Sequence, residues 1–444
     1  MSRKVFISVL GAGLYGKCKY VDGDFTSQNT FFVQTATLEF LNVKHWSKDD
    51  VGFFLLTDFA KKSNWDKNIT QRRNNIIQQD IVYRGLEQDI EDLNLPIQII
   101  PVDIPDGNNE TEIWEIFSKT FNELKDGDEL YFDVTHAFRF LPMLILVLCN
   151  YAKFLKKITV KSITYGNYEA RNKTVEPNEA PIINLLPLTQ LQDWTYAAGQ
   201  YLDSGNVKKL VELKSIIKSD ILKNIVDKLE IVIKERQTCR GLQIHNSTNL
   251  SGLKTTLSEY LSDHTTDKSE EPLHQILKEV DKSLKDFDTQ TNFMNGFNAA
   301  KWCVKNGLFQ QAITMLRENF VTLFCERHGF DIMDKDMRFI VETALNIQIN
   351  HKQNRKDKWP IDLSDNQIKQ IDNVLQDSWI KSDGKHNNAL IHVYKEIRDY
   401  RNNFNHAGFN LDSPSPIEVE TKVTEFVKRT IEIFTKLNSE KSCS

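Results

Sequence analysis

Near its start the chain reads Val5-Phe6-Ile7-Ser8-Val9-Leu10-Gly11-Ala12-Gly13, a run of β-branched and apolar residues that ends in a glycine-rich turn. Such a run predicts a buried strand. Similar runs, each bounded by turn residues, follow at Val51–Thr57, Ile97–Val102, Glu129–Val134 and Ile158–Tyr165. Stretches with helical periodicity lie between them, at Thr26–Leu41, Gln71–Leu93, Glu110–Leu124 and Phe138–Leu155.

This alternation of strands and helices predicts right-handed crossovers and a parallel sheet covered on both faces. We therefore expect a Rossmann-like α/β domain. In an open parallel sheet, ligands bind at the carboxyl ends of the strands. The loops that follow the predicted strands are thus the first place to look for a site.

The remainder of the chain has a different pattern, because after Pro187 only helical periodicity remains. The polar stretch Ser262–Pro272 reads as a loop between two helical regions. Predicted helices in the last region are Asn298–Leu316, Asp365–Trp379, Ala389–Asn405 and Ile417–Leu437, with a less regular segment at Phe330–Asp362. The 444 residues are thus predicted to form an α/β domain at 1–187, a helical connecting region at 188–290 and a helical bundle at 291–444.

The composition is that of a globular protein without a strong charge bias. Lys and Arg total 56 against 61 Asp and Glu, which gives a net charge of −5. No broad basic field is available, so any nucleic acid must bind at a local site. The first residues lack the apolar stretch of a signal peptide, and the run Leu141–Ala152 is too short to cross a bilayer. We expect a cytoplasmic protein that does not bind membranes.

The cysteines and histidines suggest no metal site. The six cysteines are scattered without a Cys-x-x-Cys pair, and the ten histidines include no His-Glu-x-x-His. Neither a disulfide framework nor a zinc centre is predicted.

The first candidate motif is Gly11-Ala12-Gly13-Leu14-Tyr15-Gly16, which formally matches G-x-G-x-x-G. The following residues do not continue as a helix, and no acidic residue closes a second strand, so a dinucleotide cofactor is disfavoured. The glycines then serve either a turn with positive φ or a loop whose backbone binds another nucleotide. We favour the second hypothesis, with Gly11, Ala12, Gly13, Leu14 and Tyr15 as ligand-binding candidates.

The second candidate motif, Asp133-Val134-Thr135-His136-Ala137-Phe138-Arg139, lies where the fourth predicted strand runs into a helix. Thr135 could simply cap that helix and Arg139 could be an ordinary surface residue. A helix N-terminus flanked by His and Arg also offers donors to phosphate or adenine. Both interpretations stay open, and the binding candidates are Asp133, Thr135, His136 and Arg139.

The third candidate motif runs from Arg401 to Gly408 at the end of a helix with an apolar face. Arg401 and His406 are about 140° apart around that helix, so they do not stack on one face. Asn402 and His406 do share a face. Taken alone, this pattern also fits the favourable interaction of cations with a helix C-terminus.

In this order, the three motifs resemble the CRISPR-associated CARF-HEPN ribonucleases that accompany type III interference complexes. The opening strand and loop look like the first CARF strand and ligand loop. Asp133–Arg139 is similar to the family's Asp-x-Thr-His-Gly-Phe-Arg motif, with Ala137 in place of the usual Gly. Ala299–Trp302 and Gln311–Glu318 look like the first HEPN helices, while the segment from Arg401 fits the R-x4-6-H motif.

The resemblance implies a homodimer, or a higher oligomer built from it, in which two CARF domains form a pocket for a cyclic oligoadenylate. Cyclic tetra-adenylate is the activator we expect, and no cofactor is expected. Binding there would activate a HEPN endoribonuclease that cleaves single-stranded RNA without a metal in antiviral defence.

The family's catalytic roles map onto Arg401, Asn402 and His406. The ribose 2′-OH would attack its own phosphodiester and leave a 2′,3′-cyclic phosphate. Arg401 would stabilise the developing charge, His406 would act as general acid or base or orient the 2′-OH, and Asn402 would support the site. The alternatives are a catalytically silent CARF sensor and a CARF domain that degrades its own ligand.

Overall fold

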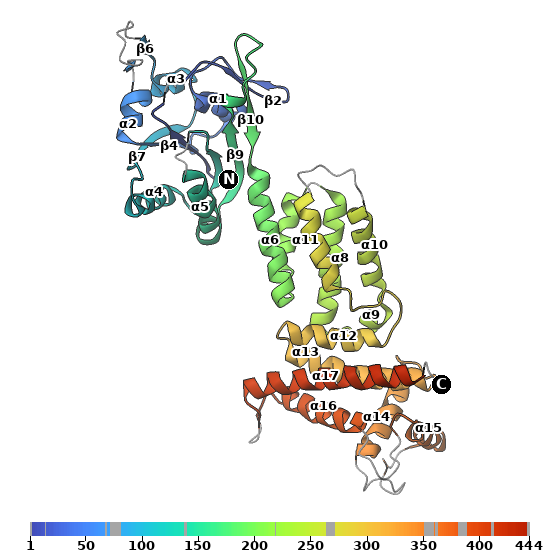
Figure 1. Ribbon diagram of the computed structural model, residues 1–444. Coiled ribbons are helices and arrows are strands. Elements are labelled where there is room, and N and C mark those ends of the chain that lie inside the picture. Colours follow the sequence, from blue (N-terminus) through green and yellow to red (C-terminus); the bar gives the residue numbers. More distant parts are fainter. Residues whose placement is uncertain are drawn as a thin grey trace. The chain divides into compact units, whose positions relative to one another are not determined.

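The structure is a computed structural model. It describes residues 2–13, 15–66, 69–71, 81–136, 140–217, 219–262, 271–349, 359, 363–380, 389–409 and 413–441. The chain divides into two compact units, Met1–Leu191 and Gln192–Ser444 (Figure 1). The first is α/β and, among the described residues, the second contains only helices. The predicted fold class is confirmed. None of the helices in the described ranges has the length and apolar character that crossing a membrane requires.

The first unit is built on one large sheet. Over the described ranges it contains eight strands in the order β3-β2-β10-β9-β8-β1-β4-β7. Their bounds are β1 Lys4–Leu10, β2 Lys19–Asp22, β3 Phe25–Thr26, β4 Val51–Leu56, β7 Gln98–Asp103, β8 Glu129–Asp133, β9 Thr159–Gly166 and β10 Glu179–Asn184. Strands β9, β8, β1, β4 and β7 are mutually parallel, as predicted. Strand β1 lies between β8 and β4, which places the loops after β1 and β8 side by side.

Helices cover both faces of this sheet, and the apolar side chains of β1 pack against helices on each face. Val5, Ile7 and Val9 share a core with helices α4 (Glu110–Glu123) and α5 (Leu141–Lys156). Phe6 and Leu10 share the opposite core with α1 (Val33–Phe40) and α3 (Leu86–Asp92). Successive side chains of a strand point to opposite faces, which explains the division.

Two predicted helices begin later than expected. The segment Thr26–Leu41 was predicted to be helical throughout, but Phe25–Thr26 pairs with β2 as β3, and Thr30 forms a bridge with Cys18. Gly23, with φ of 55°, provides the turn between β2 and β3. Around the predicted helix Gln71–Leu93, strands β5 (Ile69–Gln71) and β6 (Ile81–Tyr83) pair antiparallel, and of the residues described in that range only those of α3 are helical. The β-branched and aromatic residues of these segments favour strand pairing over a helix.

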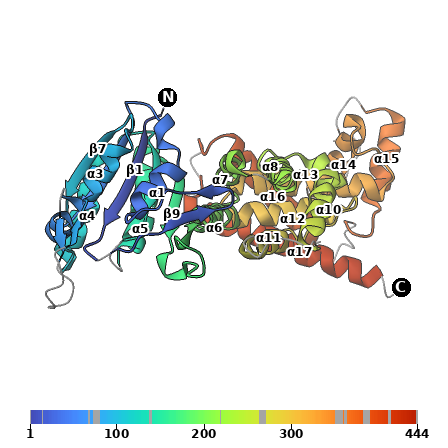
Figure 2. The same cartoon turned by 90° about the horizontal axis from the view of Figure 1, so that it is seen from above.

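The second unit packs its helices around one continuous apolar core from Trp194 to Phe434. Their bounds are α6 Leu186–Ser204, α7 Lys208–Leu213, α8 Asp220–Gln237, α9 Gly241–Asn246, α10 Thr248–Ser262, α11 Glu271–Ser283, α12 Met294–Lys305, α13 Phe309–Arg327, α14 Lys335–Ile349, α15 Asp365–Leu375, α16 Ala389–Asn405 and α17 Pro416–Lys441. Helix α8 packs on α10, α12 on α13 and α17, and α13 on α16 (Figure 2).

Two helical predictions for this unit were wrong. The expected helix Asn298–Leu316 is broken between α12 and α13, because Gly307 has φ of +72° and its N–H donates to the carbonyl of Val304. A glycine in the left-handed region is a common helix terminator. Helix α14 lies in Phe330–Asp362, where less regular structure was expected; its buried Ile340, Ala344 and Leu345 have helical spacing. The expected loop at Ser262–Pro272 lies largely outside the described residues.

Candidate functional site

The two candidate loops of the first unit meet at the carboxyl edge of the sheet. Tyr15, from the loop after β1, and His136, from the loop after β8, have ring centroids 4.2 Å apart with an interplanar angle of 37°. Tyr15 also contacts Phe32 edge to face at 5.8 Å. Because β1 and β8 are neighbouring parallel strands, their following loops meet, as the sequence predicts.

Asp133 is the buried support of the second loop. Its side chain is fully buried, with Oδ2 accepting a hydrogen bond from Ser8 Oγ (2.7 Å). Its Oδ1 accepts from the backbone N–H of Thr135 (3.1 Å) and from Thr135 Oγ1 (2.5 Å). Thr135 Oγ1 in turn accepts from the Gly166 N–H (2.8 Å), so the network reaches β9. Burial raises the pKa of Asp133, and its oxygens are occupied inside the protein rather than facing a ligand.

Asn64 supports the first loop, and sequence reasoning missed it. Its Nδ2 donates to the carbonyl oxygens of Gly11 (2.8 Å) and Gly13 (2.9 Å), and its side chain is buried. Asn64 lies in the turn that follows β4, far along the chain from the loop it holds. The carbonyls of two predicted ligand residues are therefore engaged within the protein.

A cavity of about 270 Å³ opens beside these loops. The residues around it are mostly aromatic or glycine: Tyr15, Gly16, Tyr20, Phe31, Thr135, His136, Tyr165, Gly166, Tyr168 and Glu169. Of the predicted binding residues, Tyr15, Thr135 and His136 line it. Leu14 and Arg139 lie outside the described residues, and Gly11, Ala12, Gly13 and Asp133 are not part of its lining.

Four of the aromatic residues around the cavity, Tyr20, Phe31, Tyr165 and Tyr168, were not among the predicted binding residues. Gly16 lies so close to Tyr168 that a Cβ at position 16 would fall 2.0 Å from the Tyr168 hydroxyl. Glycine here lets the hairpin that carries Tyr168 approach the first loop, and the G-x-G-x-x-G pattern was the only sequence signal of that approach.

Two polar groups that line the cavity, His136 and Tyr15, are neutral at pH 7. Burial lowers the pKa of His136 to about 4, and its Nε2 is buried without a hydrogen-bond partner. Burial likewise raises the pKa of Tyr15, whose hydroxyl lies against Gly11 without a partner of good geometry. An unpaired buried polar atom is costly, so both groups are suited to hydrogen-bond a ligand that enters the cavity.

The third motif ends α16 in the second unit. Arg401 is half-buried, and its Nε is buried without a hydrogen-bond partner. Asn402 and His406 are exposed and share a face, since the His406 N–H donates to the carbonyl of Asn402 (3.1 Å). The chain then turns through Ala407 and Gly408, with φ of 51° and 71°. Among the described residues, no hydrogen bond or ion pair of the His406 ring occurs, so it is open to solvent.

The apolar face of α16 is a core stripe, as its spacing predicts. Leu390, Val393 and Ile397 are buried, and Tyr400 packs edge to face on Phe426 at 5.1 Å. This packing fixes the helix and so presents its polar C-terminal turn at a defined place.

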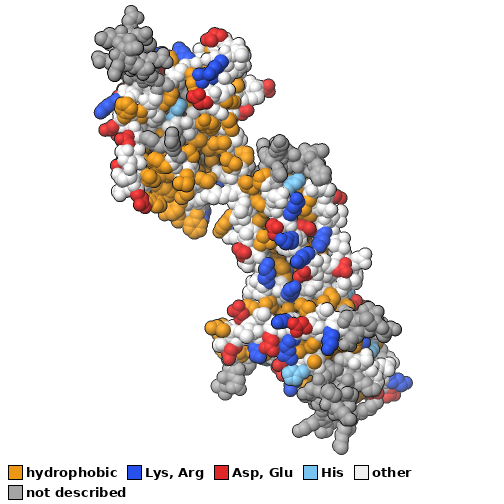
Figure 3. All heavy atoms as spheres, in the orientation of Figure 1, with side chains coloured by type: hydrophobic (Ala, Val, Ile, Leu, Met, Phe, Trp, Pro, Cys, Tyr) orange, Lys and Arg blue, Asp and Glu red, His pale blue; other side chains and the backbone are white. Residues whose placement is uncertain are grey.

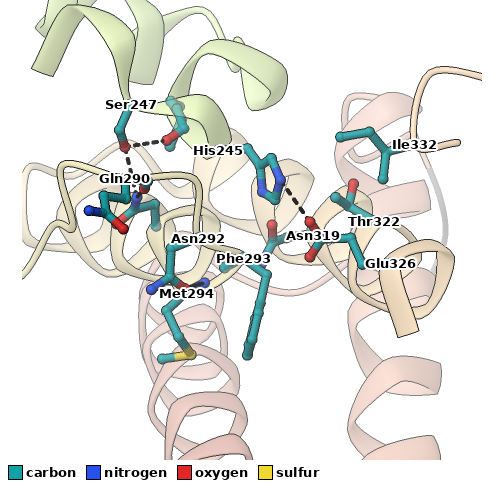
Figure 4. Close-up of polar contacts among 12 residues, drawn as sticks. His245, Ser247, Gln290, Asn292, Phe293, Met294, Asn319, Thr322, Glu326 and Ile332 are labelled. Carbon is teal, nitrogen blue, oxygen red and sulfur yellow. Dashed lines mark hydrogen bonds and ion pairs between the residues drawn. The ribbon is translucent and has the colours of Figure 1, made fainter. Parts of the chain in front are cut away.

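A buried polar network joins α9 to α12 and α13 (Figure 4). His245 is 3% exposed, and its Nε2 lies 2.9 Å from Glu326 Oε1. Its carbonyl accepts from the Asn292 N–H (3.0 Å). Asn295 Nδ2 donates to Ser247 Oγ (2.8 Å), and Asn319 Nδ2 to the carbonyl of Phe293 (2.9 Å). These contacts join side chains of three helices and so hold the helices together, while the other ring nitrogen of His245, Nδ1, is buried without a hydrogen-bond partner.

Metal ligands do not cluster in the described part of the chain: it contains no group of three or more His, Cys, Asp or Glu side chains placed to hold an ion.

Comparisons with known proteins match the first unit to a family. Residues 5–169 match the family model of the CARF domain of CRISPR system endoribonuclease Csx1. The chain is similar to CRISPR-associated protein MJ1674 of Methanocaldococcus jannaschii, with 24% identity over 253 residues, or 55% of this chain. That match spans 37% of the relative's length. A solved structure, Enterococcus italicus Csm6 bound to cyclic hexa-2'-fluoro-hexa-dAMP, aligns with 13% identity and a TM-score of 0.43, covering 98% of this chain and 95% of that one.

Proposed function

We propose that the first unit, whose residues 5–169 match the family model of the Csx1 CARF domain, is a CARF domain, and that the protein is a ribonuclease switched on by a cyclic oligoadenylate. It would act in type III CRISPR antiviral defence and cleave single-stranded RNA without a metal. The observation that carries the proposal is the aromatic cavity at which the loops of Tyr15 and His136 meet.

The cavity has the chemistry to hold an adenosine unit. Its tyrosine and phenylalanine rings offer apolar surface for a planar base. Neutral His136 and the Tyr15 hydroxyl offer hydrogen bonds, and the loop backbone lies beside them. At about 270 Å³ the cavity is near the lower end of ligand pockets, so one chain has room for part of a cyclic ligand. Cyclic tetra-adenylate, a smaller ring than cyclic hexa-adenylate, is the activator we favour.

A second copy of the chain would complete the ring site. Helix α5, which follows the loop of His136, exposes Met143, Val147, Tyr151 and Phe154 at 70%, 52%, 45% and 73%. Trp114 of α4 is 57% exposed. Hydrophobic side chains gather on this side of the first unit (Figure 3). An exposed apolar patch on the helix that follows the loop of His136 fits a dimer surface, and dimerisation there would bring two copies of that loop towards one another.

The cleavage step is assigned to the end of α16. The 2′-oxygen would form a bond to phosphorus while the bond to the 5′-oxygen breaks, giving a 2′,3′-cyclic phosphate and a 5′-OH. The proton of the 2′-OH leaves, and the departing 5′-oxygen gains one. Arg401, with an unpaired Nε, would stabilise charge on the phosphoryl oxygens. Exposed His406 would transfer a proton or orient the 2′-OH, with Asn402 in support.

The test is an RNA cleavage assay with and without cyclic tetra-adenylate and cyclic hexa-adenylate. We expect activator-dependent cleavage that falls by about 10²- to 10⁴-fold in His406→Ala. Asn405→Ala is the matched control, because Asn405 is exposed on the same turn and has no role in the proposed chemistry. Equal cleavage by His406→Ala and the control would remove His406 from the mechanism.

The same assay separates the alternatives. Tight binding of the cyclic adenylate with no RNA cleavage under any condition would identify a silent sensor. Accumulation of linear adenylates in the absence of RNA would identify a CARF domain that degrades its ligand.

A further inference from the structure

A second cavity, of about 640 Å³, lies in the second unit among α6, the end of α11 and α12. Neither proposed site uses it. The lining combines lysines, acids and aromatic residues: Tyr201, Leu202, Asp203, Glu279, Lys282, Ser283, Lys285, Asp286, Phe287, Asn298, Lys301, Trp302 and Lys305. We propose that this cavity binds the phosphate backbone of a single-stranded RNA segment flanking the cleavage point. The identity of the RNA as substrate rests on the proposed function.

The lysines at its rim supply the charge. Lys301 pairs with Asp286 (2.9 Å) and Lys282 lies 3.6 Å from Glu279. Lys285 and Lys305 take part in none of the ion pairs or side-chain hydrogen bonds among the described residues, and both are exposed. These two ammonium groups are free to meet phosphates. Lys and Arg side chains gather on the visible face of the second unit (Figure 3).

A buried cation lies behind the aromatic wall of the cavity. The Arg236 guanidinium is 3.9 Å from the ring centroid of Phe287 and 5.6 Å from that of Trp302, and both rings line the cavity. Arg236 is 2% exposed. Burial lowers its pKa to about 10, which leaves it charged at pH 7.

No carboxylate among the described residues forms an ion pair with Arg236, and neighbouring Glu235 accepts from Asn249 instead (2.5 Å). A buried charge without a paired carboxylate has a strong field at short range, because few dipoles screen it. The wall is therefore positive as well as aromatic, and it favours an anion inside the cavity.

The combination of free lysines and an aromatic wall favours nucleic acid over an acidic peptide as the ligand of this cavity. Free lysines suit phosphates, and the aromatic wall suits the base or ribose of the same nucleotide. A carboxylate-bearing peptide would use only the lysines. A net charge of −5 for the whole chain also excludes a long phosphate track, so RNA affinity must be concentrated at a hollow of this kind.

The experiment uses the full chain with His406→Ala, so that bound RNA is not cut. The double variant Lys285→Glu/Lys305→Glu is compared with Lys208→Glu/Lys278→Glu, which makes the same charge change at exposed lysines outside the cavity. Binding of a fluorescein-labelled single-stranded oligouridine is measured against salt concentration. We expect about three- to tenfold weaker RNA binding for the cavity variant. The slope of log affinity against log salt concentration should also be smaller by about 1.4, the value for two phosphate contacts on a single strand. Equal losses in both variants would overturn the proposal.

A cross-link locates the RNA directly. Oligouridine that carries 5-iodouridine is bound to the protein and the complex is irradiated. The cross-linked peptide is then identified by mass spectrometry. Attachment within 282–305 supports the cavity, whereas attachment only elsewhere overturns it. Preferential loss of polyglutamate binding over RNA binding in the cavity variant would identify a site for acidic peptides and also overturn it. Because these readouts need no cleavage, they stand even if the chain with intact His406 proves not to cut RNA.

Discussion

The cavity of the first unit and the end of α16 are built in opposite ways. Around the cavity, buried groups hold each other in place, as in the bonds from Asp133 to Ser8 and Thr135 and from Asn64 to Gly11. At the end of α16, His406 is exposed and Arg401 Nε is unpaired. The difference teaches that one chain builds its part of the proposed ligand pocket from its own side chains, whereas the proposed catalytic groups Arg401 Nε and His406 have no partner among the described residues. We infer that a second chain completes the cleavage site.

The largest effect is expected from a variant that prevents two chains from associating. Met143→Glu/Phe154→Glu places charges in the exposed apolar stripe of α5, which should separate the chains. RNA cleavage should then fall by about a hundredfold, because misplaced catalytic groups lose that much rate. Molar mass from light scattering and cleavage rate are measured together. Val175→Glu, at a 37% exposed apolar position in the same unit, is the control. A dimer with full activity in the double variant would break the contrast.

A smaller effect is expected from removing the support of the cavity. Asp133→Ala leaves Ser8 Oγ and the Thr135 N–H without their partner. Unfolding free energy should fall by about 3 kcal/mol, as for a buried hydrogen-bond network, and affinity for cyclic tetra-adenylate should fall with it. Urea unfolding followed by circular dichroism measures the first quantity. Asp103→Ala is the matched control, since Asp103 also ends a parallel strand but pairs with Lys61 at the surface. Its loss should stay below about 1 kcal/mol.

The smallest effect concerns pH. His136 has a pKa of about 4 in the folded chain, below the usual value of 6.5, so the unfolded chain binds the proton more readily. The contribution of neutral His136 to the free energy of unfolding is fully present above pH 6.5. It is lost as the pH falls from 6.5 towards 4. In that pH window, the slope of unfolding free energy against pH that is due to His136 should approach about 1.4 kcal/mol per pH unit.

His136→Gln should remove this slope, measured as unfolding free energy at several pH values. His45→Gln, at an exposed histidine, should leave it in place. Identical pH profiles for wild type and His136→Gln would show that His136 is already solvated, and the contrast between a closed and an open site would weaken.

The sequence was most informative where the relevant interactions are local. Buried strands such as β1 and β4 read as apolar runs, and parallel order then placed Tyr15 beside His136. Strands β2 and β10 escaped prediction because their pairing joins segments far apart in the chain, such as Lys19 and Glu179. Asn64 escaped for the same reason: its role depends on contacts with Gly11 and Gly13 across the sheet edge, and a polar turn carries no motif for them.

The proposed catalytic assignment differs, because it rests on a motif whose geometry, in our proposal, a second chain completes. The spacing of Asn402 and His406 predicted a shared face, and the backbone bond between them is consistent with it. In the proposed site Arg401 and His406 act together across a partner surface, and periodicity along one helix does not encode such a surface. The division into regions at 188–290 and 291–444 also stays a prediction.

The continuous core of the second unit limits which parts of the chain recombination can exchange. The Arg236 guanidinium lies 5.6 Å from the ring centroid of Trp302, a Cβ at Gly205 would lie 2.6 Å from Trp302, and His245 pairs with Glu326. Each contact crosses residue 290. A recombination event that joined the middle helices to a foreign C-terminal bundle would leave a buried arginine and histidine facing the wrong side chains. The middle and terminal helices should therefore be inherited together, while the first unit, with its own core, is free to be exchanged.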